Sequence, residues 1–404
     1  MDYILIFHSN LNYSQLRPEK REFVCRESYE RLNDFFSHKF PEVKWCFEAS
    51  GFTIDYMAEH TPDVLEKLKY SISQKKCEFI GSPYAHSILT NFPEEDGVYS
   101  LEFSLESYQK HLGITPATGW NPEGCWNQKI PEMFKKVGYK ILITDWDSYL
   151  KSNDETIKKE ESYQNKVSKD GLKYLSDKID PTDKTLHFPM QIIPGLKGVM
   201  RTDRVSAKTL YYFQGDFEFE ELTKIIEKFS SKNEGFLVVY AEDTEYLGTT
   251  AWYYLKYHNK FKFFEKNPES FDRLERLVEF LLKHGNLITV SEAVEKYQTL
   301  NIPFHIDDGF AWHNAYAIAW ASTPWAKELD KECDRVRKKI KEAEKKIKTE
   351  EEKERIRKAW FYLVQAENSD GRWPPPPFKP GEFNVQYCKD MLKKAEILAT
   401  SILG

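Results

Sequence analysis

Short apolar runs alternate with longer amphipathic stretches along most of the chain, and this alternation most restricts its fold. Each apolar run is long enough for one strand, and the stretch after it has the spacing of a helix that buries one face. Repeated β–loop–α units favour a parallel sheet covered by helices. The predicted strands cover residues 3–7, 43–47, 77–80, 115–120, 139–144, 236–240 and 287–290.

Such a sheet can be closed or open. Seven or eight strands would close a barrel, in which the chemistry lies at the C-terminal ends of the strands. An open, doubly wound sheet is the alternative. The first predicted strand leads into His8-Ser9-Asn10 and not into the glycine-rich fingerprint of a dinucleotide-binding fold.

The sequence changes character after about residue 300. A run of Lys and Glu between residues 327 and 358 carries Val336, Ile340, Ala343 and Ile347, the spacing of one helix face. A second helix follows around Trp360, prolines at 374–377 end it, and the last predicted helix covers 383–403. We therefore expect a barrel over residues 1–300 and an α-helical domain over 301–404. A polar excursion at about 150–185 is either a lid or a variable loop.

Composition excludes some classes of protein. The net charge of −6 over 404 residues argues against a nucleic-acid partner, which needs a basic face. The chain contains no apolar stretch of about 18 residues and opens on a predicted strand, so we expect neither a membrane span nor a signal peptide. The six cysteines form no CxxC pair and predict buried thiols in a cytoplasmic protein. Abundant Lys and Glu are typical of a thermophile, and a homo-oligomer is left open.

One acid stands on a sharp turn after the fourth predicted strand. Glu123 follows Pro122, which stiffens the strand exit, and precedes Gly124, which lets the backbone turn. Trp120 and Trp126 flank the turn, so Glu123 could be presented into a cleft between two indoles. The alternative is an ordinary helix-start Glu, stabilised by the helix dipole.

Three acids follow the most apolar predicted strand: Glu242, Asp243 and Glu245. A buried strand does not end in three carboxylates for packing reasons, because like charges repel. The cluster indicates a metal site, an acid with a shifted pKa, or an exposed strand end, and we favour a functional role. Cleavage of a glycosidic bond needs two carboxylates across one sugar ring, and Glu123 and Asp243 are the candidates.

Five short regions, in order and spread over nearly the whole chain, resemble glycoside hydrolase family 57, a group of retaining amylases, glucanotransferases, branching enzymes and α-galactosidases. The regions are residues 8–10 (His-Ser-Asn, where many members have His-Gln-Pro), 77–86, 120–126, 241–248 and 367–373. The departure after His8 is similar to the shorter members. The resemblance implies a (β/α)7-type barrel followed by a C-terminal helical bundle, with Glu123 as nucleophile and Asp243 as acid/base.

The resemblance also implies a carbohydrate substrate, either an α-glucan or an α-galactoside. Its implied binding residues are His8, Glu78, His86, Trp120, Trp126, Asp370 and Trp373, the last two reaching the active-site mouth from the helical tail. Each of the histidines and tryptophans has a structural alternative as a satisfied core residue. Asp308, Trp312 and His313 are further candidates.

We expect no metal and no cofactor, because no close ligand pair of the kind found in zinc sites occurs. A metal-dependent carbohydrate deacetylase on a similar barrel is an alternative, with Asp307-Asp308 and His313 as the nearest local match. A glycan-binding relative without catalysis is a third, and the presence of both Glu123 and Asp243 argues against it.

Overall fold

The computed structural model describes residues 1–160, 179–250, 264–313, 315–373 and 382–404. Within them, seven parallel strands form a ring in the order β8-β1-β2-β3-β4-β5-β7. β7 contacts β8 and thereby completes the ring. The strands are β1 (Asp2–Ser9), β2 (Trp45–Ala49), β3 (Cys77–Gly81), β4 (Thr118–Trp120), β5 (Ile141–Asp145), β7 (Leu196–Arg201) and β8 (Phe236–Asp243). The fold class is therefore confirmed as a mixed α/β barrel.

β1 is paired with other strands along both of its edges. It pairs with β8 along one edge from Asp2 to His8 and with β2 along the other edge from Ile6 to Ser9. Nearer the N-terminal end of β1, the short β11 (Asn286–Leu287) pairs with its first residues. β6 (Met190–Ile193) runs antiparallel to β7, and β9 (Gly248–Thr249) pairs with β10 (Lys266–Asn267) in a separate small sheet.

Apolar side chains fill the interior of the barrel. They come from alternate residues of each strand, because successive side chains point to opposite faces. Ile4 and Ile6 of β1 are two of them, and His8 follows on the same face. Helix α14 (Val290–Lys296) adds Val290, Ala293 and Val294 at the N-terminal end of the strands, and this end is closed. We therefore expect the functional site at the C-terminal end of the strands.

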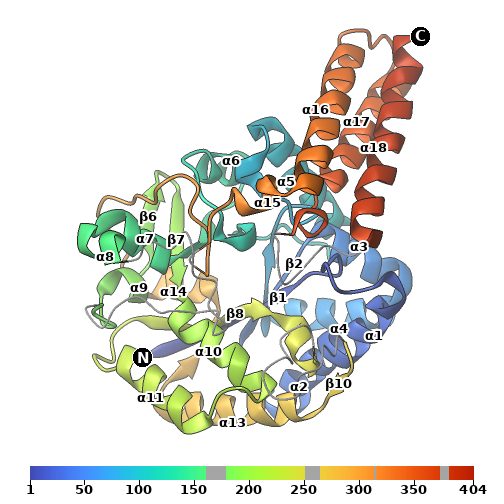
Figure 1. Ribbon diagram of the computed structural model, residues 1–404. Coiled ribbons are helices and arrows are strands. Elements are labelled where there is room, and N and C mark those ends of the chain that lie inside the picture. The colour runs from blue at the N-terminus through green and yellow to red at the C-terminus, as the bar shows by residue number, and fades with distance from the viewer. Residues whose placement is uncertain (161–178, 251–263, 314, 374–381) are drawn as a thin grey trace.

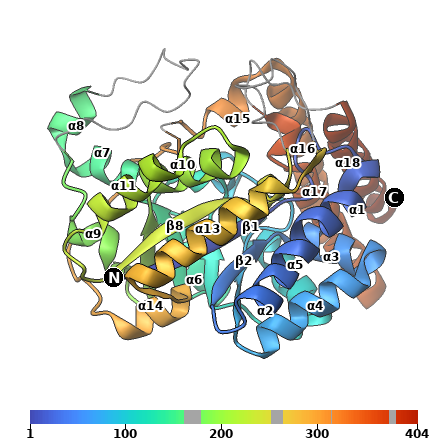
Figure 2. The ribbon, with the colours of Figure 1, turned by 90° about the horizontal axis from the view of Figure 1, so that it is seen from below.

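Helices surround the strands (Figure 2). Their bounds are α1 (Arg21–Val24), α2 (Arg31–Lys39), α3 (Gly51–His60), α4 (Pro62–Ser73), α5 (Glu94–His111), α6 (Ile130–Lys136), α7 (Trp146–Asn153), α8 (Glu155–Glu160), α9 (Lys184–His187), α10 (Asp203–Gln214), α11 (Phe219–Phe229) and α13 (Glu269–His284). None of the helices that the structure describes combines the length and apolar character needed to cross a membrane.

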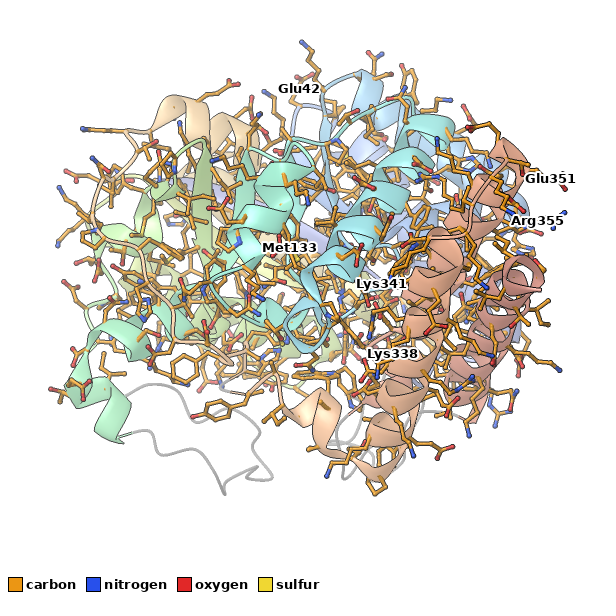
Figure 3. The ribbon with its side chains drawn as sticks, turned by 90° about the horizontal axis from the view of Figure 1, so that it is seen from above. Glu42, Met133, Lys338, Lys341, Glu351 and Arg355 are labelled. Carbon is orange, nitrogen blue, oxygen red and sulfur yellow. The ribbon has the colours of Figure 1, made fainter. Side chains whose placement is uncertain are left out.

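Three long helices at the C-terminal end pack side by side (Figure 1). They are α16 (Pro324–Glu344), α17 (Glu350–Ala366) and α18 (Glu382–Leu403), preceded by the short α15 (Ala319–Ser322). Their apolar core continues into the barrel helices, where Trp360 of α17 stacks on Tyr99 of α5 with ring centroids 4.7 Å apart. Lys341 of α16 pairs with Glu95 of α5, and Figure 3 shows α16 running beside α5.

A buried arginine fixes this contact. Arg337 of α16 donates through Nε to Asp96 Oδ2 of α5 at 2.5 Å and through Nη2 to Glu367 Oε1 at 2.9 Å. Its side chain is 7% exposed, and the two carboxylates are 0% and 1% exposed. Since Glu367 opens the segment that carries Asp370, this ion-pair network sets how the helical part meets the barrel.

Two expectations for the strands need correction. Of the predicted strand at 287–290 only Leu287 lies in a strand, the two-residue β11, because Thr289 caps α14 in a reciprocal capping box with Glu292 and the chain turns helical at Val290. The missing barrel strand is β7, whose apolar sequence pattern is interrupted by Gly198. The polar excursion begins as α7 and α8, but residues 161–178 lie outside the described residues, as do the prolines at 374–377. The domain boundary at residue 300 stays a prediction.

Loss of Arg337 should destabilise the protein strongly. Arg337→Ala leaves Asp96 and Glu367 buried without their cation, and we expect the free energy of unfolding to fall by about 3–5 kcal/mol in denaturant titrations. The matched control is Arg335→Ala on the same helix, whose 44% exposed side chain pairs with Glu396. That change should stay within about 1 kcal/mol. Equal losses in the two variants would contradict a structural role for the buried network.

Candidate active site

The C-terminal end of β1 brings a histidine between two acids. In the strand register His8 lies opposite Glu48 of β2 on one side and Asp243 of β8 on the other. Its Nδ1 hydrogen-bonds Glu48 Oε2, and its Nε2 lies 3.8 Å from Asp243 Oδ1. Burial alone would lower the pKa of His8, but the Glu48 carboxylate overcomes this effect and raises it to about 10. His8 is therefore a cation at neutral pH.

Glu123 stands on the turn that follows β4, as its neighbours predict. Its φ is +56°, a left-handed conformation that non-glycine residues adopt only where the surroundings enforce it. Two hydrogen bonds from Trp312 hold Glu123 in this conformation. The indole Nε1 donates to Glu123 Oε2 at 2.5 Å, and the Trp312 backbone N–H donates to the Glu123 carbonyl at 2.8 Å. Glu123 is therefore not a helix-start residue but a buried, clamped carboxyl.

Both candidate carboxyls hold protons more strongly than free carboxyls do. Burial raises the pKa of Glu123 to about 7, while the Trp312 hydrogen bond and the charge of His8 oppose that rise. Burial also raises the pKa of Asp243 well above its usual range, with the charges of Glu245, Glu242 and Glu123 adding to the effect and His8 opposing it. The environment therefore favours the protonated form of each carboxyl, and His8 counteracts this effect at both.

The helical tail contributes the carboxyl of Asp370 and the hydroxyl of Ser369 to the region around His8. Asp370 accepts hydrogen bonds from Asn10 Nδ2 at 2.7 Å and from the Ser14 backbone N–H at 2.8 Å. Burial raises its pKa to about 7, and the Glu123 charge contributes. His86 lies 4.8 Å from His8 between ring centroids, and its Nδ1 is 3.0 Å from Ser369 Oγ. Burial and the His8 charge hold the pKa of His86 well below its usual value, so His86 is neutral.

A second charged cluster, centred on Arg201, lies beside Glu123. Arg201 ends β7 and binds Asp145, Asp203 and Glu242, with the Arg201–Glu242 distance at 2.5 Å. Its guanidinium lies 5.0 Å from the ring of Trp312, in position for a cation–π contact. The cluster therefore supports the residue that clamps Glu123.

Ligand atoms of Asp203, Glu242 and His313 approach within 4.8 Å of one another, a spacing that could hold a metal ion. Arg201 already pairs with the first two, so a guanidinium supplies the positive charge there. The deacetylase match of Asp307-Asp308 with His313 does not form. Asp308 bonds Gln128, Asp307 bonds His305, and His313 faces Asp203.

Two predicted binding residues lie elsewhere, and their assignment needs correction. Glu78, near the start of β3, accepts from Thr118 Oγ1 at 2.6 Å and from the backbone and hydroxyl of Ser291 at 2.8 and 2.7 Å. It sits at the N-terminus of α14, at the closed end of the barrel, where a helix dipole favours an acid. Trp126 is 2% exposed, belongs to the main core and packs 5.4 Å from Phe304 between ring centroids.

The other two tryptophans lie at or behind the site. Trp120 is buried and stacks on His8, with ring centroids 5.2 Å apart and an interplanar angle of 12°. One of its faces is therefore occupied, and it supports the histidine. Trp373 is half-buried, 5.9 Å from Trp320 between ring centroids, in an apolar cluster that includes Cys125 of the Glu123 turn. Trp373 therefore lies near the Glu123 turn, at the edge of the candidate site.

Three residues of the site escaped sequence reasoning: Glu48, Arg201 and Asp203. Glu48 and Arg201 each stand at the C-terminal end of an apolar strand, the same signal that pointed to Asp243. Asp203 is the first residue of α10, where an acid also has an ordinary capping role. The sequence therefore held a usable signal for the first two, and none that was specific for the third.

A family model described as glycosyl hydrolase family 57 matches residues 3–305. The 4-alpha-glucanotransferase of Thermococcus litoralis is 23% identical over 180 residues, covering 44% of this chain and 26% of the relative. An alpha-amylase of Pyrococcus abyssi is 19% identical over 175 residues, covering 43% and 26%. The chain thus matches about a quarter of the length of these relatives.

Solved structures share the fold. The 4-alpha-glucanotransferase of Thermococcus litoralis superposes with a TM-score of 0.67 at 17% identity, covering 99% of this chain and 59% of that one. The alpha-amylase AmyC of Thermotoga maritima gives a TM-score of 0.68 at 12% identity, covering 100% of this chain and 93% of that one. Both matches extend over the barrel and the C-terminal helices, and at these identities they bear on the fold alone.

The charge on His8 should depend on Glu48. NMR of the imidazole nitrogens should find His8 protonated from pH 7 to about pH 9, because its pKa is raised to about 10 and protonation is lost only as the pH passes that value. In Glu48→Gln the titration midpoint should fall by about 2 units or more, since burial then acts with little opposition. His86 should stay neutral in both proteins. A neutral His8 at pH 8 in the unaltered protein would refute this assignment.

Proposed function

Since the chain belongs to glycosyl hydrolase family 57, we propose that it is a retaining glycosidase or transglycosylase that acts on α-glucans. The substrate class rests on its relatives, an alpha-amylase and a 4-alpha-glucanotransferase. Whether water or a second sugar accepts the glycosyl group distinguishes the two activities.

The observation that carries the proposal is that His8 lies against Asp243 and that its charge acts on both Asp243 and Glu123. Each carboxyl stands at the C-terminal end of a barrel strand or on the turn that follows it. Their charges interact, because the Glu123 carboxylate raises the pKa of Asp243. A double-displacement glycosidase needs two carboxyls about 5–5.5 Å apart, one ionised and one protonated.

In the first step, a Glu123 oxygen bonds to the anomeric carbon as the glycosidic C–O bond breaks. The leaving oxygen takes the proton of Asp243. In the second step the Asp243 carboxylate takes a proton from water or from an incoming sugar hydroxyl, and the new oxygen displaces Glu123. Two inversions leave the anomeric configuration retained. The raised pKa of Asp243 favours its protonated form, and the Trp312 hydrogen bond favours the carboxylate of Glu123 by lowering its pKa.

Glu123→Gln should abolish turnover while leaving glycan binding nearly unchanged. The amide has the same shape but cannot attack, so kcat should fall by about 10³-fold or more. Product chromatography on a panel of α-glucans and α-galactosides measures the loss and also identifies the preferred sugar. Calorimetry should give a Kd within about threefold of the unaltered protein. Glu132→Gln, an exposed acid on α6, is the matched control. Near-normal turnover of Glu123→Gln would refute the assignment of the nucleophile.

On an aryl α-glycoside whose leaving group needs no proton, Asp243→Ala should stop at the glycosyl-enzyme and respond to azide. The small anion needs no general base, so azide should restore release and give a glycosyl azide. NMR of the product should find the anomeric configuration of the substrate retained. A product of inverted configuration would exclude the two-step mechanism. Activity that survives prolonged chelation would exclude the metal-dependent deacetylase alternative.

A further inference from the structure

A segment far from Glu123 in the chain lies directly along it. Residues 308–313, here named the clasp segment, exchange backbone hydrogen bonds with the Glu123 turn. Gly309 N donates to Trp126 O, Trp126 N donates to Phe310 O, and Trp312 N donates to Glu123 O, each at 2.8 Å. The Trp312 indole adds its hydrogen bond to the Glu123 carboxyl. The orientation of Glu123 therefore depends on where the clasp segment is held.

His313 fixes the end of the clasp segment that follows Trp312. Its backbone N–H donates to Asp203 Oδ2 at 2.7 Å, and its Nδ1 lies 3.2 Å from Asp203 Oδ1. Its Nε2 lies 3.6 Å from Glu242 Oε2. The φ angle of His313 is +51°, in the left-handed region, so its backbone is held by these contacts rather than by its own preference.

Charge explains why a histidine stands there. The charged groups that face His313 are Asp203 of α10, Glu242 of β8, Arg201 of β7 and Glu123 itself. Asp203 and Glu242 share the Arg201 guanidinium, which also reaches Asp145 at 3.3 Å. One guanidinium cannot neutralise three buried carboxylates, and an imidazolium supplies a second positive charge. Glu242 precedes Asp243 on β8, so this anchor joins the strand of the acid to the clamp on the nucleophile.

We propose that His313 is a positioning residue that latches the clasp segment to Asp203 and Glu242, and through Trp312 sets the orientation and ionisation of Glu123. The inference rests on the proposed function in one respect, that Glu123 is the nucleophile. His313 acts through Trp312, whose ring lies 4.8 Å from its own between centroids, and also by its own charge, which lowers the pKa of Glu123. Its side chain is 31% exposed, which leaves the position accessible to a small solute.

The test uses His313→Gly, because glycine accepts the left-handed backbone and leaves room for free imidazole. The first measurement needs no activity. The chain has 10 tryptophans, so a ¹H–¹⁵N spectrum holds at most that many indole signals, and Trp312→Phe identifies the one from Trp312. In the unaltered protein this signal should titrate near pH 7, following Glu123. In His313→Gly the midpoint should rise by about one unit, and added imidazole should reverse the change.

The second measurement is kinetic. On the α-glucan that the unaltered protein prefers, His313→Gly should lose about 10–100-fold in kcat with KM changed less than threefold. The acidic limb of kcat/KM should move to higher pH together with the indole midpoint, and imidazole should restore both. His313→Asn keeps a residue that tolerates the left-handed backbone without the charge, and it should behave as the glycine variant does without imidazole. His305→Gly, an exposed histidine paired with Asp307, is the matched control and should change neither measurement.

The outcomes test the latch, which is the positioning role of His313, separately from the proposed function. An indole midpoint that is unchanged in His313→Gly and His313→Asn overturns the latch whatever the activity. A rise in KM alone also overturns it, because His313 would then contact the substrate. If the unaltered protein cleaves no α-glucan while the indole midpoint responds as expected, the proposed function fails and the latch on Glu123 stands.

Discussion

His8 carries its positive charge in a buried space at the C-terminal end of the barrel. Glu48 and Asp243 face it from the two neighbouring strands, and Glu123 and Asp370 lie within reach of its field. Burial by itself raises the pKa of Asp243, Glu123 and Asp370, and the charge of His8 opposes that rise at each of them. The parallel register of β8, β1 and β2 is what brings these residues to one level.

Much of the fold follows from local sequence. β1, β3, β5 and β8 are continuous apolar runs, as buried parallel strands are, and their predicted bounds agree with the structure to within a few residues. β7 escaped because Gly198 breaks its pattern. Residues 287–290 were assigned to a strand although the capping box from Thr289 to Glu292 was present in the sequence. Local signals thus compete, and only the packing decides between them.

The site was less accessible to sequence reasoning. Glu123 has a local signal in its turn, and Asp243 has one in the end of its strand. Glu48 and Arg201 matter because of the side chains that approach them from other strands, and no single segment contains that information. Glu78 and Trp126 illustrate the converse, because each belongs to a recognisable motif but faces α14 or the main core. In each case the motif identified the residue but not the direction in which its side chain points.

Asp370 reaches the barrel from the far end of the chain. It bonds Asn10 and Ser14 in the loop after β1, and Asn384 of α18 donates to the backbone of Asn12 in the same loop. The first and last parts of the polypeptide therefore share one polar network. A ribosome that has released β1 through β8 has exposed both Glu123 and Asp243, yet that network is still incomplete. Synthesis of the helical tail thus becomes the step that completes the candidate site, and a nascent chain lacks Asp370 there before then.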